Sequence, residues 1–174
     1  MNPSTVPSLS RCLASLFYES LLLVAIMLVV SAALTPLQLV LGRDSVLLHT
    51  LIQLAVAAAL FAYFGYCWTR SGQTVAMKTW YIRLVSADGQ LLRWQQALAR
   101  FLIAAMLFIG LPVVSYLGWQ RSYGDHPAVK WLALIWWLLP FLARYYDKDK
   151  RHLHDRLAGT RLVLLPKPTR GGKA

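Results

Sequence analysis

The sequence has few acidic residues and few cysteines, and both shortages limit what the protein can be. It holds 7 Asp and Glu residues against 18 Lys and Arg residues, for a net charge of +11. Its two cysteines, Cys12 and Cys67, are too few for a disulfide framework, and we expect reduced thiols. A strongly positive net charge can indicate binding to nucleic acid. Here the basic residues flank apolar runs instead of forming one patch, so we predict no nucleic-acid binding.

Motifs of common catalytic and cofactor sites are also absent from the sequence. There is no Gly-rich phosphate loop, no Cys-x-x-Cys motif and no clear pairing of a nucleophile with a base. His152, His154 and Asp155 lie close together in the tail, but no second group of Cys or His completes a tetrahedral metal site. We therefore expect no metal, no cofactor and no enzymatic activity. A surface enzyme built on these three side chains is the least favoured class.

Long apolar runs dominate what is present. Hydrophobic residues make up 57% of the chain and the mean hydropathy is +0.49, whereas soluble domains are about 45–50% apolar. The first run, Cys12–Leu34, has no Lys, Arg, Asp or His. Its length of about 23 residues spans a hydrocarbon core of about 30 Å. The run is too long for a signal-peptide core and lacks a good cleavage site, so we predict an uncleaved span.

Four such runs predict an all-α integral membrane protein with a bundle of four transmembrane helices. The expected spans are residues 12–34, 46–68, 98–118 and 128–144. Thr35-Pro36 is expected to end the first span, and Pro112 to kink the third. A short lead, residues 1–11, precedes the membrane domain at 12–165, and a flexible tail follows at 166–174.

A small cytoplasmic β element is expected in the second polar loop. Thr79–Val85 is rich in aromatic and β-branched residues, and Ala87-Asp88-Gly89 suits a turn because Asp-Gly tolerates positive φ. Gln90–Leu92 would then form the return strand of a β-hairpin. Because a lone hairpin is marginally stable, we expect Gly159–Leu165 of the tail to add a third strand.

The distribution of basic residues predicts the orientation in the membrane. With four spans, the N-terminal lead, the second loop and the tail share one side, which carries 15 Lys and Arg residues against 3. The positive-inside rule then places both termini in the cytoplasm. This basic face also suits contact with anionic headgroups of the bilayer, at about 1 kcal/mol per residue near the surface. Membrane insertion alone would also explain the charge.

One acid interrupts the first apolar run. Glu19 follows Arg11 by eight residues, which is roughly 12 Å further along a helix. A carboxylate at such a depth costs about 2.5 kcal/mol or more unless it is protonated, paired or hydrated. We therefore expect Glu19 to face protein or a cavity. Two roles stay open: a titratable site in an ion or proton path, or a structural carboxylate paired with an Arg of another helix.

The tail holds a second acid of interest. Asp155 is expected to brace the cytoplasmic layer against Arg83, Arg93 or Arg100. Gly159 is expected to supply a left-handed turn into the last strand, because glycine adopts positive φ without steric cost.

These features together resemble the RDD family of bacterial membrane proteins, over roughly residues 10–165. The resemblance rests on Arg11 with an acid two turns into the first span, Gly72-Gln-Thr-x-Ala-Met-Lys78, Val85-Ser-Ala-Asp-Gly89, Ala99-Arg100 and, most specifically, His154-Asp155-Arg-Leu-Ala-Gly-Thr160. The family is named for one Arg and two Asp. Asp155 matches the second Asp, and the longer acid Glu19 stands near the first. The position of the family's Arg is Cys12 here, one residue after Arg11.

The resemblance implies a multi-pass protein of the bacterial inner membrane with a role in ion, proton or small-ligand transport. The functional candidates are Arg11, Glu19, Arg100 and Asp155, and the family-motif residues are Gly72, Thr74, Lys78, Asp88, Gly89, His154, Gly159 and Thr160. Four spans make a thin pathway, so transport would need a homo-oligomer. The alternative is a membrane scaffold or partner subunit whose basic cytoplasmic face binds anionic lipid or another protein.

Overall fold

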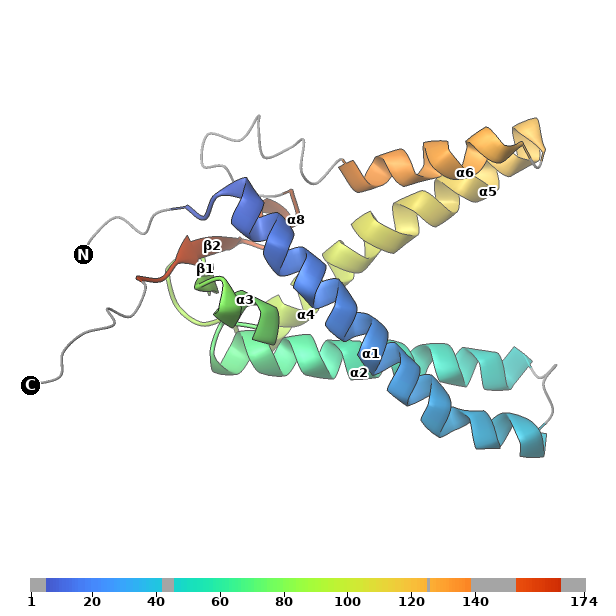
Figure 1. Ribbon diagram of the computed structural model, residues 1–174, viewed down its shortest axis with the longest axis horizontal. Helices are drawn as coiled ribbons and strands as arrows, with labels where there is room; N and C mark the ends of the chain where they lie inside the picture. Colours follow the sequence, from blue (N-terminus) through green and yellow to red (C-terminus); the bar gives the residue numbers. More distant parts are fainter. Residues whose placement is uncertain (1–5, 42–45, 125, 139–152, 167–174) are drawn as a thin grey trace, which may run out of the picture. The chain divides into compact units, whose positions relative to one another are not determined.

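The computed structural model describes residues 6–41, 46–124, 126–138 and 153–166 of a mostly helical chain (Figure 1). The elements in chain order are α1 (Leu9–Leu41), α2 (Val46–Arg70), α3 (Val75–Thr79), β1 (Ile82–Ser86), α4 (Trp94–Ala105), a π-helical turn (Met106–Gly110), α5 (Leu111–Tyr123), α6 (Pro127–Leu134), a 3₁₀ turn (Ile135–Leu138), α8 (Leu153–Leu157) and β2 (Thr160–Leu164). The chain divides into two compact units, Met1–Arg83 with Val163–Ala174, and Leu84–Leu162.

The first unit is an antiparallel pair of long apolar helices with a short helix at one end. α1 crosses α2, packs against it and also contacts α3 (Figure 1). By length and composition, Leu9–Leu37 and Val46–Arg70 are long and apolar enough to cross a membrane. Their outward side chains are apolar and strongly exposed, for example Val29 at 69% and Val46 at 80%. Such exposure is unfavourable in water and is expected of helices that face lipid.

We predicted that the first helix ends at Thr35-Pro36, and this is wrong. α1 continues through Pro36 to Leu41. Proline removes one backbone hydrogen bond and crowds the preceding turn. The hydroxyl of Thr35 donates to the carbonyl oxygen of Ser31 at 2.9 Å. The carbonyl that loses its donor to Pro36 is that of Ala32, so this bond reinforces the turn before the proline and does not replace the missing one. The residue before a proline is therefore a weak stop signal in a helix of this hydropathy.

The second unit contains a third long helical stretch, Trp94–Tyr123, that could cross a membrane by the same criteria. This stretch begins at Trp94, four residues before the predicted start at Leu98. At its start, the side chain of Gln96 accepts a hydrogen bond from the backbone N–H of Arg93 at 3.4 Å. In its middle the N–H of Leu111 donates to the carbonyl of Met106, which is a π-helical turn. Pro112 follows directly, and the wider turn accommodates a residue that has no N–H and a bulky ring.

The predicted fourth span, 128–144, is described only as far as Leu138. Within that range α6 packs against α5, and the 3₁₀ turn follows α6. Among the described residues, three helices meet the length and hydropathy needed to span a membrane. The remainder of the predicted span lies outside the described residues.

The β element is a two-stranded antiparallel sheet of β1 and β2. Within the first unit Leu165 N–H donates to Tyr81 O at 2.8 Å, and within the second Ala87 N–H donates to Gly159 O at 2.9 Å. The predicted tail strand is therefore confirmed as the partner of β1.

The predicted return strand Gln90–Leu92 does not form in the structure. The turn is present: Ser86 N–H donates to Gln90 O at 2.9 Å, and Gly89 has φ +81°. However, α4 begins at Trp94, which leaves too little chain for a second ladder. The described sheet thus has two strands, not the three expected.

Candidate functional site

Glu19 is buried in the first unit and is held by two hydroxyl groups. It is only 6% exposed although it lies in an apolar helix. The hydroxyl of Tyr63 on α2 donates to its Oε1 at 2.8 Å, and the hydroxyl of Thr74 donates to its Oε2. Each carboxylate oxygen therefore has a donor, and the expectation that Glu19 faces protein is confirmed.

The helix α1 presents Glu19 inward on a narrow polar stripe. Cys12, Ser15 and Glu19 are its buried residues in the N-terminal half, and their spacing of three and four places them on one helical face. Leu16 and Phe17 on other faces are exposed. This arrangement, with polar groups inside and apolar groups outside, is typical of ionisable residues within membrane spans.

The two hydroxyls that bind Glu19 also bind the backbone of α3. Thr74, at 0% exposure, is the N-cap residue of α3, and its hydroxyl accepts from Met77 N–H at 3.2 Å. The hydroxyl of Tyr63 accepts from Val75 N–H at 3.3 Å. The carboxylate of Glu19 is therefore the point at which α1, α2 and α3 are joined.

The loop before α3 is fixed by a separate set of hydrogen bonds. Gly72 is buried and has φ +70°, a conformation that glycine adopts without steric cost. The hydroxyl of Ser71 donates to Cys67 O at 3.1 Å, and the amide of Gln73 donates to Ile82 O at 2.8 Å. The Nε of Arg83 donates to Ser71 O at 3.0 Å. The Gly72–Lys78 motif thus folds as a braced turn followed by a short helix.

One of the two roles left open for Glu19 was that of a structural carboxylate paired with an Arg. The structure shows no such pair within the ranges it describes. Among the described residues its hydrogen-bond partners are the Tyr63 and Thr74 hydroxyls, and no Lys or Arg there forms an ion pair with it. Arg11 lies in the first turn of α1 and is half-buried. It makes no ion pair with another described residue.

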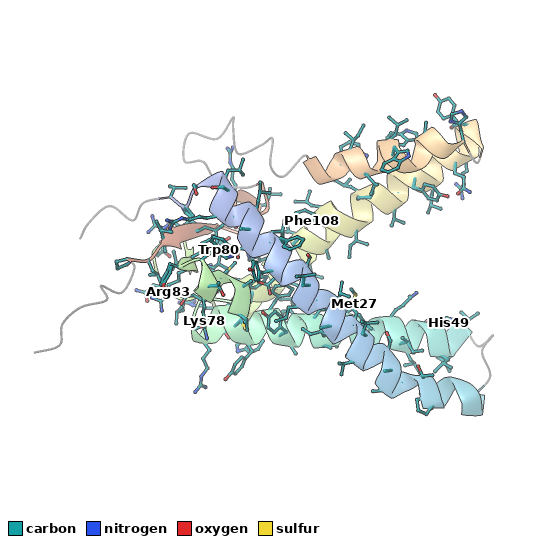
Figure 2. The ribbon with its side chains drawn as sticks, viewed as in Figure 1. Met27, His49, Lys78, Trp80, Arg83 and Phe108 are labelled. Carbon is teal, nitrogen blue, oxygen red and sulfur yellow. The ribbon has the colours of Figure 1, made fainter. Side chains whose placement is uncertain are left out.

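Basic and aromatic side chains gather at the end of the first unit where α3 lies, with Arg70 and Lys78 exposed and Trp80 and Arg83 half-buried. Lys78, Trp80 and Arg83 are at this end, whereas His49 is near the opposite end of α2 (Figure 2). The antiparallel helices bring the first turn of α1 and the last turn of α2 to the same end. Of the described residues, the Lys and Arg at this end are Arg11, Arg70, Lys78 and Arg83.

Two aromatic contacts belong to this basic end. Tyr18 and Trp80 meet edge to face with ring centroids 6.2 Å apart, and the guanidinium of Arg70 lies 6.0 Å from the ring centroid of Tyr66. Aromatic rings mixed with Lys and Arg are typical of the membrane–water interface.

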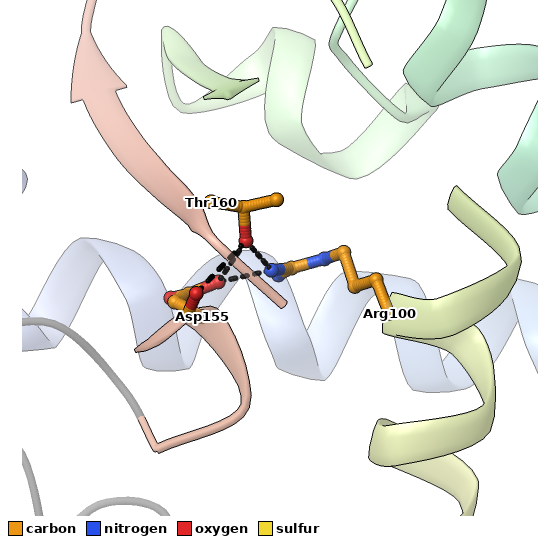
Figure 3. A network of polar contacts seen from close by, with 3 residues as sticks. All are labelled: Arg100, Asp155 and Thr160. Carbon is orange, nitrogen blue, oxygen red and sulfur yellow. Dashed lines mark hydrogen bonds and ion pairs between the residues drawn. The ribbon is translucent and has the colours of Figure 1, made fainter. Parts of the chain in front are cut away.

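A second buried polar cluster joins Arg100, Asp155 and Thr160 in the other unit (Figure 3). Their exposures are 4%, 1% and 0%. Arg100 Nη1 forms an ion pair with Asp155 Oδ1 and donates to Thr160 Oγ1 at 2.6 Å. The Thr160 hydroxyl in turn donates toward the backbone oxygen and Oδ1 of Asp155, at 3.3 and 3.4 Å.

The family motif His154–Thr160 folds so that Asp155 and Thr160 both reach this guanidinium. Asp155 lies in α8, Gly159 follows with φ +62°, and β2 begins at Thr160. The predicted left-handed turn at Gly159 is confirmed. Of the three arginines that the sequence offered to Asp155, the structure selects Arg100. Arg83 binds Ser71 O instead, and Arg93 is exposed.

Asp88 and Gly89 lie apart from both clusters. Asp88 is exposed in the turn after β1, and a Cβ on Gly89 would meet Arg161 Nη2 at 3.4 Å. His154 lies in α8. Within the described residues no group of three or more His, Cys, Asp or Glu could hold a metal ion, and His152 lies outside that range.

We expect Gly159→Ala to lower the free energy of unfolding by about 1–2 kcal/mol, because an L-residue is strained at positive φ. The strain comes from the backbone, since an added Cβ would meet nothing within 4 Å. Gly118 in α5 is a matched control with equally open space and no positive φ. There Gly→Ala is expected to stabilise the helix by about 0.5–1 kcal/mol. Thermal unfolding in detergent would measure both, and equal shifts would contradict the role of the left-handed turn.

Comparison with known proteins gives one match. A model of the RDD family matches residues 5–159. No curated protein and no solved structure matches the chain.

Proposed function

We propose that this chain, which belongs to the RDD family and is a membrane protein with long apolar helices, transports an ion or small ligand coupled to protons. Glu19 is the titrating group in this proposal. The observation that carries it is a carboxylate, 6% exposed, inside a helix long enough to span the membrane. Ionisable residues in such positions commonly mark ion pathways or proton relays.

The neutral partners of Glu19 support a titrating role. Tyr63 and Thr74 contribute hydroxyls, which can donate or accept a hydrogen bond. Glu19 can therefore gain or lose a proton without breaking an ion pair. Asp155, in contrast, is bound to a permanent positive charge on Arg100. This difference supports a positioning role for Arg100 and Asp155, and a proton-carrying role for Glu19.

The proposal includes a topology for the whole chain. A lead, residues 1–11, precedes a membrane domain at 12–165 with four spans, and both termini lie in the cytoplasm of a bacterial inner membrane. The basic end of the first unit supports this orientation, because it holds Arg11, Arg70, Lys78 and Arg83. A single chain offers a thin pathway, so we propose a homo-oligomer, without cofactor or enzymatic activity. Chemical cross-linking that gives only monomer would count against it.

Proton flux into liposomes tests the proposal. Purified protein is reconstituted with an internal pH dye, and sodium, potassium and proton gradients are applied in turn. We expect cation-dependent proton flux that falls at least about tenfold in Glu19→Gln, since the amide cannot carry the proton. Asp88→Asn is the matched control, because it removes one acid from an exposed turn and is expected to keep the flux. Equal flux from wild type and Glu19→Gln would exclude Glu19 as the titrating group.

The basic end of the first unit supports a second candidate function. Among the described residues of this unit Glu19 is the one acid, and it is buried, so the exposed charge at this end is positive. A scaffold or partner subunit that binds anionic headgroups or an acidic protein would use such a surface. Folded protein without flux under any gradient would favour this candidate.

A further inference from the structure

The hydrogen-bond directions at Glu19 are fixed by α3. A Tyr or Thr hydroxyl has one hydrogen to donate and lone pairs with which to accept. The Tyr63 oxygen accepts from Val75 N–H, and the Thr74 oxygen accepts from Met77 N–H. The single hydrogen of each hydroxyl is therefore directed to Glu19, one to each carboxylate oxygen. This pattern matches an ionised carboxylate, which accepts hydrogen bonds only.

A proton on Glu19 would not fit this arrangement. The new acid hydrogen needs an acceptor, and the oxygens beside it belong to Tyr63 and Thr74. To accept it, one hydroxyl must turn its own hydrogen away from the carboxylate. At Thr74, which has 0% exposure, that hydrogen would then lack a partner, which is unfavourable, and a partly satisfied network loses its rigidity.

We propose that α3 docks on α1 and α2 only while Glu19 is ionised, and that protonation of Glu19 releases α3. This inference deepens the proposed function, since it rests on Glu19 titrating, but the response of α3 can be measured without any transport. Uptake of a proton at the buried carboxylate would thereby change the membrane-surface end of the first unit.

Other groups around Glu19 are few. From α2, Tyr63 and Cys67 face it, and Cys67 lies close enough to interact electrostatically with both Glu19 and Lys78. From the α3 segment come Thr74 and the exposed Lys78, and on α1 the buried Ser15 lies one turn away. Phenol, thiol and ammonium groups ordinarily lose protons only above neutrality. Glu19 is therefore the group in this set whose charge changes in mildly acidic solution.

The release should be confined to the helix itself. Ser71 and Gln73 are bound to Cys67 O and Ile82 O by bonds that do not involve Glu19. We expect Thr74–Thr79 to loosen while the preceding loop keeps its contacts. This local pattern distinguishes release of α3 from general unfolding.

Hydrogen–deuterium exchange of the full chain in lipid nanodiscs tests the inference. After correction for intrinsic rates, exchange in peptides covering Val75–Thr79 should increase about tenfold as the solution becomes acidic, the size expected for one lost hydrogen bond. Glu19→Gln should show the fast rate at every pH, and Tyr63→Phe should behave similarly if Glu19→Gln folds poorly. The turn at Ser86–Gln90, closed by the Ser86–Gln90 hydrogen bond, is the internal control and should not change.

Two results would overturn the inference: α3 exchange in folded Glu19→Gln equal to that of wild type, or a wild-type rate that does not depend on pH. The outcome is separable from that of the flux experiment. Release of α3 that depends on pH, without proton flux, would retain the inference and reject transport. Glu19-dependent flux with unchanged α3 exchange would retain transport and reject the inference.

Discussion

Asp155→Asn is expected to lower the free energy of unfolding by about 3–5 kcal/mol, the largest effect of any single substitution considered. The ion pair between Arg100 and Asp155 is nearly inaccessible, with side chains 5% and 1% exposed. Removing the negative charge takes away the counter-ion that Asp155 supplies to a buried guanidinium, and a neutral amide does not offset the cost of that desolvation. Chemical denaturation in detergent, followed by tryptophan fluorescence, would measure the loss.

A double variant tests whether the loss comes from the Arg100 charge that Asp155 no longer balances. When both members of a buried pair are replaced by apolar residues of similar size, stability is often retained or increased. Arg100→Met combined with Asp155→Leu should therefore recover much of the stability lost in Asp155→Asn. Asp88→Asn is the surface control, because Asp88 is exposed and should shift stability by less than about 0.5 kcal/mol. A loss below about 1 kcal/mol for Asp155→Asn would show that groups other than Asp155 compensate the guanidinium of Arg100.

Sequence patterns predicted the three long apolar helices well because the relevant forces are local. An apolar run must be long enough to cross the hydrocarbon core, and its backbone must satisfy its own hydrogen bonds. The predicted spans at 12–34, 46–68 and 98–118 lie within the observed helical stretches Leu9–Leu41, Val46–Arg70 and Trp94–Tyr123. The errors concern the ends of the helices: α1 continues through Pro36, and the third helical stretch begins at Trp94 instead of Leu98.

Short elements were not predictable in the same way, because distant contacts stabilise them. α3 has five residues, far fewer than an isolated helix needs in water. It exists because Thr74 caps it and Tyr63 binds Val75 N–H. The return strand at Gln90–Leu92 was predicted from turn chemistry alone, and α4 takes up the chain that a strand would have needed. β2 was predicted correctly because Gly159 and the apolar run after it signal a turn and a strand together.

In the candidate sites, too, local features were predictable from the sequence and distant contacts were not. Burial of Glu19 followed from the cost of a charge within an apolar run. Its partners did not, since Tyr63 and Thr74 lie 44 and 55 residues away in the sequence. The sequence offered three arginines as partners of Asp155 and favoured none of them. Only the fold brings Arg100, 55 residues away, into contact with it. A buried charge can be predicted from composition, but its partner is set by tertiary structure.

Thr74→Val is expected to lower the free energy of unfolding by about 2–4 kcal/mol, although it nearly conserves volume. The hydroxyl of Thr74 serves two groups at once, as acceptor for Met77 N–H and as donor to Glu19. Loss of an N-cap bond costs about 1 kcal/mol, and loss of a hydrogen bond to a charged group about 1.5–3 kcal/mol. Val removes both at a site with 0% exposure, so water cannot replace the hydroxyl.

Thr74→Ser separates the hydroxyl from the methyl group. Serine keeps both hydrogen bonds and loses one methyl, for which we expect about 0.8 kcal/mol. The route of the Thr74→Val loss is then tested in a Glu19→Gln background, by the same denaturation experiment. If much of the loss arises because a carboxylate is deprived of a donor, the substitution will cost less when position 19 is neutral, since contacting residues are not additive. Equal costs in the two backgrounds would assign the effect to the cap of α3 alone, and Glu19 would then be only a neighbour of that cap.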